Sequence, residues 1–212
     1  MGRAASYAAQ YGRTPGRRSR LRFRLVLPMG SSEWAREVVG VDLSEKMLAR
    51  ARATTSDSLI SYERADLERL ELPEARFDLA YSSLALHYIK DTTRLFATLH
   101  RALVPNGSFV FSTEHPIYMA PTNPAWSIAV DGRRTWPLDH YLVEGPRTTN
   151  WLANGVVKYH RTIGSTLNAL IRSGFTIRQV EEFCPTAEQI AAKPELVSEC
   201  ERPMFLLVAA EK

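Results

Sequence analysis

The sequence predicts an α/β fold with a doubly wound, mostly parallel sheet of seven strands, an antiparallel last strand and an insert after the fifth strand. From residue 38 onward, short apolar runs alternate with amphipathic stretches, as strands and helices do in a parallel sheet. Residues that can cap helices, Ser44 and Asp91, stand where two of those stretches begin. Acids follow two of the runs, at Asp42 and Asp66, where strands of such a sheet end.

The composition is that of an ordinary globular chain. Its 212 residues are 45% hydrophobic and 24% charged, and the net charge is +4. Because the surplus is local and the rest of the chain is close to neutral, the charge argues against a nucleic-acid partner. The surplus comes from six arginines within twelve residues: Arg13, Arg17, Arg18, Arg20, Arg22 and Arg24.

Cysteine usage and hydropathy indicate a compartment. Cys184 and Cys200 fit a reduced cytoplasmic protein better than a disulfide scaffold. No apolar run approaches the length of a membrane span, and the N-terminal residues lack the apolar segment of a secretion signal. We therefore expect a cytoplasmic protein without a membrane partner, and no metal site is predicted.

Each element is predicted from its residue types. The run 38–41 is β-branched, which suits a strand buried on both faces. The stretch 105–107, Pro-Asn-Gly, stops a helix and turns the chain into the next strand, and Gly174 stops a later helix. Further strands are expected at residues 60–63, 77–82, 108–113, 175–180 and 204–209, and helices are expected after Ser44, after Asp91 and at 164–173.

Two segments break this rhythm. Residues 1–37 are irregular, and their strand-like part, 20–27, alternates apolar residues with arginines, as a degraded first strand would. Residues 114–158 hold five prolines, and their aromatic residues are all Trp or Tyr. Long segments without periodicity are usually functional. We therefore expect a domain at 38–212 in which 114–158 is a lid or substrate-binding insert.

Four stretches together carry a resemblance to a known family. They are Val-Gly-Val-Asp-Leu-Ser-Glu-Lys-Met-Leu (39–48), Arg-Ala-Asp-Leu (64–67), Phe-Asp-Leu-Ala-Tyr-Ser-Ser-Leu-Ala-Leu-His-Tyr (77–88) and Leu-Val-Pro-Asn-Gly-Ser-Phe-Val-Phe-Ser (103–112). The chain resembles a class I S-adenosylmethionine-dependent methyltransferase that acts on small molecules, of the "methyltransferase type 11" kind. The resemblance implies a Rossmann-like fold, S-adenosyl-L-methionine as cofactor and a small-molecule substrate.

The resemblance assigns five residues to the adenosine half of the cofactor. Asp42 would bind the ribose hydroxyls, and Leu43 would pack against the adenine. Asp66 would accept the adenine amino group, with Ala65 and Leu67 nearby. All of them lie at or just past the carboxyl ends of predicted parallel strands, where open α/β sheets bind ligands.

The same resemblance places Ser82 beside the methionine part of the cofactor and His87 opposite the transferred methyl group. A sulfonium methyl is already activated, so catalysis mostly requires an aligned acceptor, with a base when the acceptor is a hydroxyl. We expect His87 and His115 as catalytic residues. Tyr118, Tyr159 and His160 are expected to line the substrate pocket, and the last two are further candidates for the base.

One motif of the family is missing. Members carry a glycine-rich turn, Asp-x-Gly-x-Gly-x-Gly, after the first strand, where glycines let the backbone approach the cofactor closely. Here Gly30 stands alone, and Arg20, Arg22 and Arg24 occupy the strand position. The sequence therefore predicts weak or absent cofactor binding. A catalytically inactive binding or scaffold protein stays open as an alternative, and a nicotinamide-dependent oxidoreductase on the same sheet is a more distant one.

We interpret the missing motif as a local frameshift. When codons for residues 18–29 are read from the second base of the Arg18 codon, allowed choices spell Asp-Leu-Gly-Cys-Gly-Phe-Gly-Trp-Phe-Cys-Arg-Trp. The last Trp is forced, because Met29 has a single codon and Gly30 supplies the next G. The shift also explains the arginine surplus, since GC-rich codons read out of frame tend to encode arginine.

The coding DNA tests this interpretation directly. We expect its shifted frame to encode the glycine-rich turn at residues 18–29, and the original frame to return near residues 34–36. Codons that do not spell those glycines in the shifted frame would rule the frameshift out.

Overall fold

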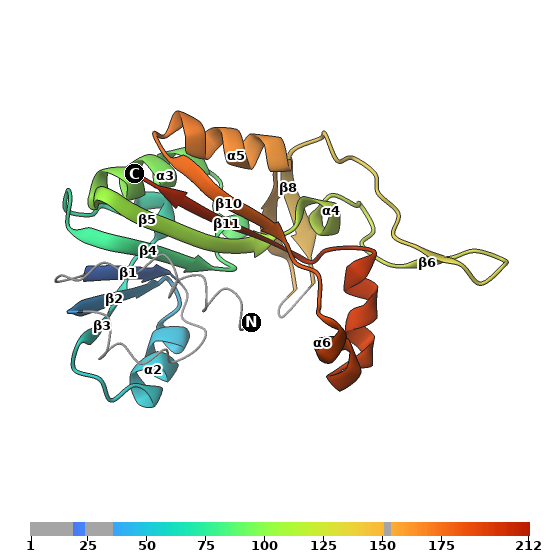
Figure 1. Cartoon of the computed structure of the whole chain (residues 1–212), viewed down its shortest axis with the longest axis horizontal. Helices are drawn as coiled ribbons and strands as arrows, with labels where there is room; N and C mark the ends of the chain where they lie inside the picture. The colour runs from blue at the N-terminus through green and yellow to red at the C-terminus, as the bar shows by residue number, and fades with distance from the viewer. Residues whose placement is uncertain (1–18, 24–35, 151–153) are drawn as a thin grey trace.

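The computed structural model describes residues 19–23, 36–150 and 154–212, the first of these ranges by its backbone alone. The expected α/β fold with a mixed sheet is confirmed (Figure 1). Within the described ranges the main sheet has seven strands, in the spatial order β10 (Thr176–Glu182), β11 (Phe205–Glu211), β5 (Leu103–Glu114), β4 (Phe77–Ser83), β1 (Ser19–Phe23), β2 (Glu37–Asp42) and β3 (Ile60–Arg64).

Strand directions make the sheet mixed. β5, β4, β1, β2 and β3 run parallel to one another, whereas β11 is antiparallel to both β5 and β10. The strand-order reversal lies at β1, with β2 and β3 on one side and β4 and β5 on the other. In an open sheet of this kind, ligands bind beyond the carboxyl ends of the strands at such a reversal.

The first strand occupies the centre of the sheet in spite of its arginines. The backbone of Ser19–Phe23 pairs parallel with β2 on one side and with β4 on the other. The predicted strand covered residues 20–27, of which 24–27 lie outside the described residues. Gly30 and the rest of the segment that we interpret as frameshifted, through residue 35, lie outside them as well.

Helices begin at the predicted capping residues. The Ser44 hydroxyl accepts a hydrogen bond from the Met47 N–H at the start of α2 (Glu45–Thr54), and the Asp91 carboxylate accepts one from the Arg94 N–H at the start of α3 (Thr92–Ala102). α5 (Ile163–Arg172) is followed by Gly174, whose φ of 95° is the left-handed conformation expected of a helix stop. Of the helices described, none combines the length and apolar character needed to cross a membrane.

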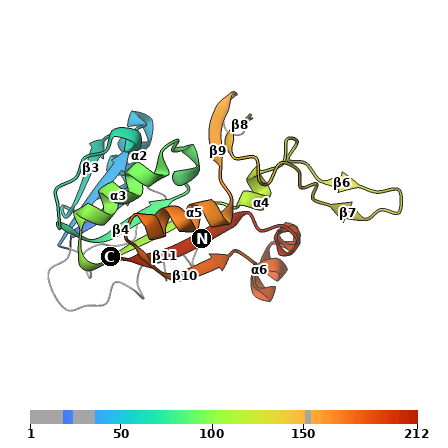
Figure 2. The ribbon, with the colours of Figure 1, turned by 90° about the horizontal axis from the view of Figure 1, so that it is seen from above.

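The core lies between the sheet and two of these helices. α3 and α5 contact each other and pack on β5 and β10, whereas α2 packs on β2 and β3 at the other end of the sheet (Figures 1 and 2). Rings of Phe96, Phe109 and Phe111 meet at centroid distances of 5.1–6.1 Å and are almost fully buried. Burial of each such side chain stabilises the fold by roughly 1.5–3 kcal/mol. The packed core therefore holds the strands of the sheet in place.

The insert is more ordered than the sequence indicated. It contains the short helix α4 (Pro116–Met119) and two antiparallel hairpins, β6 (Ser127–Ile128) with β7 (Arg134–Thr135) and β8 (Gly145–Thr149) with β9 (Val156–His160). Figure 2 shows the β6–β7 arm projecting from the body of the molecule. The predicted end of the insert at Lys158 falls inside β9, so the insert extends to the start of α5.

Other differences from the predicted elements are local. The predicted turn at 105–107 is an irregular part of β5, where pairing with β4 shifts between Phe77 and Leu79. The sequence reading assigned nothing between β10 and β11, where the structure has α6 (Ala187–Ala192) and a 3-10 helix, η3 (Pro194–Cys200). Two further 3-10 turns, η1 (Leu67–Arg69) and η2 (Leu86–Tyr88), follow β3 and β4.

Candidate functional site

The two acids that the sequence singled out lie at one cavity. Asp42 ends β2, Asp66 follows β3, and the two strand ends are joined by a 3.2 Å hydrogen bond from the Ala65 N–H to the Asp42 carbonyl oxygen. Both acids line a cavity of about 530 Å³. Its other walls are mostly apolar and come from four parts of the chain: Val41, Leu43, Met47, Leu67, Ala85, Ile89 and Val156.

Local turns fix both carboxylates. Oδ1 of Asp42 accepts a hydrogen bond from the Ser44 N–H at 2.8 Å, and Oδ1 of Asp66 accepts one from the Glu68 N–H at 3.0 Å. Within the described part of the chain, Oδ2 of each acid has no hydrogen bond. The cavity therefore combines two half-buried acceptors with a hydrophobic wall, which is the chemistry that recognises a hydroxyl- and amino-bearing aromatic ligand.

The other expected cofactor residues do not line this cavity. Ala65 packs against the core, and Ser82 is fully buried at the end of β4. The Ser82 hydroxyl has no hydrogen-bond partner among the described residues. Buried polar groups in folded proteins usually have a hydrogen-bond partner, and the residues that follow β1, the strand paired with Ser82, lie outside the described ranges. The structure thus brings Asp42, Leu43, Asp66 and Leu67 together, and leaves Ser82 deeper in the sheet.

His87 belongs to a buried charged cluster at the end of β5. Its Nδ1 accepts the backbone N–H of Glu114 at 3.3 Å, which leaves Nε2 to carry the ring hydrogen toward Oε1 of Glu114, 3.8 Å away. The same Oε1 accepts a hydrogen bond from Nζ of Lys158 at 2.5 Å. Glu114 and Lys158 are almost fully buried, so each charge depends on the other.

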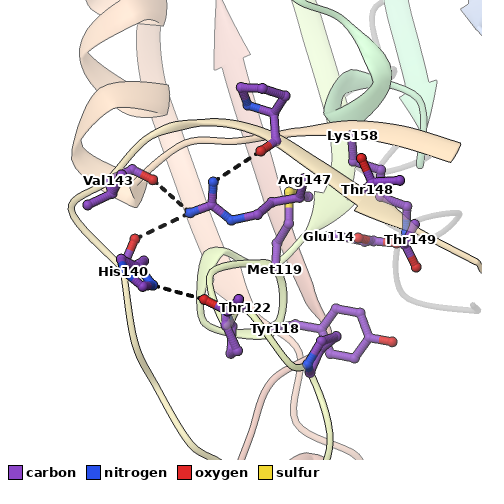
Figure 3. A pocket seen from close by; sticks show the side chains of 13 residues that line it. Glu114, Tyr118, Met119, Thr122, His140, Val143, Arg147, Thr148, Thr149 and Lys158 are labelled. Atoms are coloured by element: carbon purple, nitrogen blue, oxygen red, sulfur yellow. Dashed lines mark hydrogen bonds and ion pairs between the residues drawn. The ribbon is translucent and has the colours of Figure 1, made fainter. Parts of the chain in front are cut away.

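This cluster lies between the cavity of Asp42 and Asp66 and the insert. The Lys158 ammonium is 5.9 Å from the ring centre of Tyr88, which lines the cavity of Asp42 and Asp66. Glu114 and Lys158 also line a second cavity of about 450 Å³ under the insert, together with Tyr118 (Figure 3). A small pocket next to it is lined by His87, Glu114 and Tyr159, among others. The charged cluster therefore lines the two pockets next to the insert and contacts, through Tyr88, the wall of the cavity of Asp42 and Asp66.

Arg147 holds the second cavity in shape. Figure 3 shows its guanidinium turned toward backbone carbonyls, away from Glu114 and Lys158. It donates to the carbonyl oxygens of Val143 at 2.7 Å, of Ala120 and Pro146 at 3.2 Å each, and of His140 at 3.4 Å. Because its donors are used by the loop, Arg147 supports the wall instead of offering a charge to a ligand.

Two of the expected histidines are buried and form hydrogen bonds within the fold. His115 is fully buried; its Nδ1 accepts the Ile117 N–H at 3.1 Å, and its Nε2 donates to Glu182 at 2.8 Å. His160 is equally buried, and its Nε2 donates to the Tyr141 carbonyl oxygen at 2.8 Å. Neither lines any of the three cavities described above. Both rings therefore have structural partners, and the roles expected for His115 as a base and for His160 as a pocket residue stay predictions.

Sequence reasoning missed Glu114 and Lys158. Glu114 carries the same signal as Asp42, an acid at the carboxyl end of an apolar strand, and could have been found by it. Lys158 carries no such signal, because it lies 44 residues from its partner and is surrounded by an irregular segment. Tyr118 and Tyr159 do line cavities, as expected of substrate-pocket candidates.

Comparisons with known proteins agree on one class. The family described as "Methyltransferase domain" matches residues 25–111. The crystal structure of a S-adenosylmethionine-dependent methyltransferase from Mesorhizobium loti is 58% identical, with a TM-score of 0.86 over 99% of this chain and 98% of that one. An uncharacterized protein from Haemophilus influenzae is 36% identical over 84% of this chain and 73% of its own length.

More distant relatives match in part only. A malonyl-[acyl-carrier protein] O-methyltransferase from Pseudescherichia vulneris is 38% identical over 97 residues. That match covers 46% of this chain and 38% of the relative.

The buried histidines predict acid sensitivity. Burial lowers the pKa of His160 and of His115 from the ordinary 6.5, although their hydrogen bonds to Tyr141 and Glu182 oppose the shift. A lowered pKa means that the folded chain binds fewer protons than the unfolded chain, so stability is lost as pH falls below about 6.5 and through the folded pKa. Protonation of His160 would also bury an Nδ1–H, and this atom has no hydrogen-bond partner among the described residues.

We expect the unfolding free energy, measured by urea titration between about pH 5 and pH 8, to fall on acidification. His160→Gln should reduce that slope by up to about 1.4 kcal/mol per pH unit. His140→Gln, at an exposed histidine, is the matched control for the loss of an imidazole ring. An unchanged slope in His160→Gln would show that His160 is not buried as a neutral ring.

Proposed function

The chain belongs to the S-adenosylmethionine-dependent methyltransferases, and we propose that its reaction is methyl transfer to a small-molecule acceptor bound under the insert. S-adenosylmethionine is the cofactor of this class and, when bound, supplies an activated methyl group. The protein's task is then to orient the two reactants and to manage one proton.

The observation that carries the proposal is the shared cavity of Asp42 and Asp66. Both acids keep an oxygen free of hydrogen bonds within the described residues, and both face the same apolar wall. We assign Asp42 to the ribose hydroxyls, Asp66 to the adenine amino group, and Leu43 and Leu67 to the adenine faces. The lone hydroxyl of Ser82, deeper at the end of β4, fits the amino-acid end of the cofactor.

The acceptor side is proposed at the junction next to the charged cluster. Glu114 lines both the small pocket and the larger cavity under the insert, so it can reach an acceptor from either. Its carboxylate can accept a hydrogen bond from a hydroxyl acceptor and take its proton, and Lys158 holds the carboxylate in place. His87 holds Glu114 from the other side. We therefore transfer the role of base from His115 to Glu114, with Tyr118 and Tyr159 as wall residues.

Cofactor binding is proposed to be impaired in this chain. The glycine-rich turn expected at residues 18–29 is replaced by arginine-rich sequence, and most of that segment lies outside the described residues. Loss of the turn removes backbone donors from the amino-acid end of the cofactor but leaves the adenosine cavity in place. The alternative is a member kept as an inactive binding or scaffold protein, which the same missing turn favours.

The partial relatives do not supply the acceptor. The malonyl-[acyl-carrier protein] O-methyltransferase from Pseudescherichia vulneris matches less than half of this chain. The acceptor must therefore be inferred from the residues of the insert, which forms the proposed acceptor cavity.

Calorimetric titration with S-adenosylhomocysteine tests both parts of the proposal. We expect the chain as it stands to bind at least about tenfold more weakly than a version whose residues 18–29 are replaced by the glycine-rich turn. In that restored chain, Asp42→Asn and Asp66→Asn should each weaken binding by roughly tenfold or more, because each removes a charge-assisted hydrogen bond. Asp131→Asn is the control, since Asp131 caps a similar turn in the distant arm.

The outcomes separate the readings. Equal affinity of the original and restored chains would contradict impaired binding, and unaffected Asn variants would contradict the adenosine assignment. A folded restored chain that does not bind the ligand would favour the inactive scaffold.

A further inference from the structure

Two exposed thiols lie together at the base of the insert. Cys184 follows β10, Cys200 ends η3, and their Sγ atoms are 3.7 Å apart although the residues are 16 positions apart in the sequence. We propose that Cys184 and Cys200 form a reversible disulfide that fastens η3 to the end of β10.

The geometry needs little movement. A disulfide bond is about 2.05 Å long, so the two sulfurs must approach by less than about 2 Å. Both thiols lie at the ends of elements and are exposed, which leaves room for that shift and access for an oxidant. The segment between them is already compact, because α6 begins with a reciprocal pair of hydrogen bonds between Thr186 and Gln189.

The reaction is thiol–disulfide exchange with a low-molecular-weight disulfide such as oxidised glutathione. The thiolate of one cysteine attacks the small disulfide, forms a mixed disulfide and releases one small thiol. The second cysteine then attacks the protein sulfur of that mixed disulfide and releases the other small thiol. The two protein thiols are oxidised and lose two hydrogens, and the small disulfide is reduced to two thiols. The contact with Cys184 raises the pKa of the Cys200 thiol.

The disulfide would act on the insert through Arg202. Glu199, beside Cys200, pairs with Arg202 at 2.6 Å, and both are buried. The Arg202 guanidinium lies 4.6 Å from the ring centre of Tyr118 and 4.5 Å from that of Trp136, and it also faces Trp126. Tyr118 and Trp136 stack on each other at 5.7 Å. A buried ion pair is costly to separate, so Arg202 stays with Glu199 at the end of η3. Because Arg202 also contacts Tyr118 and Trp136 of the insert, a disulfide that fixes η3 should restrict the motion of the insert.

Tyr118 lines the cavity under the insert, so oxidation would also stiffen one wall of the acceptor site. That consequence rests on the proposed function, whereas formation of the disulfide does not.

Oxidation of the full chain with a glutathione redox buffer tests the proposal. Peptide mass mapping after alkylation should show a single intramolecular link between Cys184 and Cys200. The melting temperature should rise by roughly 5 °C, because the closed loop restricts the unfolded chain, and dithiothreitol should reverse the rise. Cys184→Ser and Cys200→Ser are the matched variants; each should take up one glutathione and show no such rise.

Hydrogen–deuterium exchange of the same samples tests the link to the insert. We expect slower exchange at residues 116–149 in the oxidised chain, and no change in Cys184→Ser. Glutathione on both cysteines without a link, or disulfide-linked dimers, would overturn the proposed disulfide. A link that leaves exchange in the insert unchanged would overturn the coupling to the insert. Neither result depends on cofactor binding, so both are distinct from a failure of the proposed function.

Discussion

The parallel pairing of β2 with β3 is the constraint on which the site depends. Parallel neighbours end at the same edge of a sheet, so Asp42 and Asp66 come together only if both strands keep their direction and register. The register pairs Asp42 with Arg64, and the next backbone bond, from Ala65 to Asp42, closes the edge. Local turns then aim both carboxylates at one cavity. The cavity that we propose for adenosine is therefore set by the ends of β2 and β3 and by the turns that follow them.

Burial of charge organises the acceptor side in a similar way. Removing one partner from a buried ion pair costs roughly 3–5 kcal/mol, so Glu114 and Lys158 must stay together. Because Glu114 ends β5 and Lys158 lies in β9, this pairing fixes the far end of the insert to the sheet. Arg161 adds to it by donating to the carbonyl oxygens of Ile89 and Lys90. Arg202 does the same for the near end through Tyr118 and Trp136. Basic side chains thus hold both ends of the insert against the rest of the fold.

Local sequence signals predicted most of the elements and the two acids that line one cavity, and they failed where partners are distant. Ser44 and Asp91 cap their helices as expected, because a cap depends only on the next few residues. His115 was expected to be a base from its place just past the fifth strand, and its hydrogen bond to Glu182, 67 residues away, leaves no trace in the local sequence. The hairpins of the insert were missed for a similar reason, since their short strands have no hydrophobic period. The capping box at Thr186 was readable and would have revealed α6.

The most direct test of the account is a crystal structure of the frame-restored chain with S-adenosylhomocysteine. The account predicts both ribose hydroxyls within about 3 Å of the Asp42 carboxylate and the adenine amino group within about 3 Å of Asp66. A ligand bound outside this cavity, or one whose ribose hydroxyls and adenine amino group face water, would contradict it.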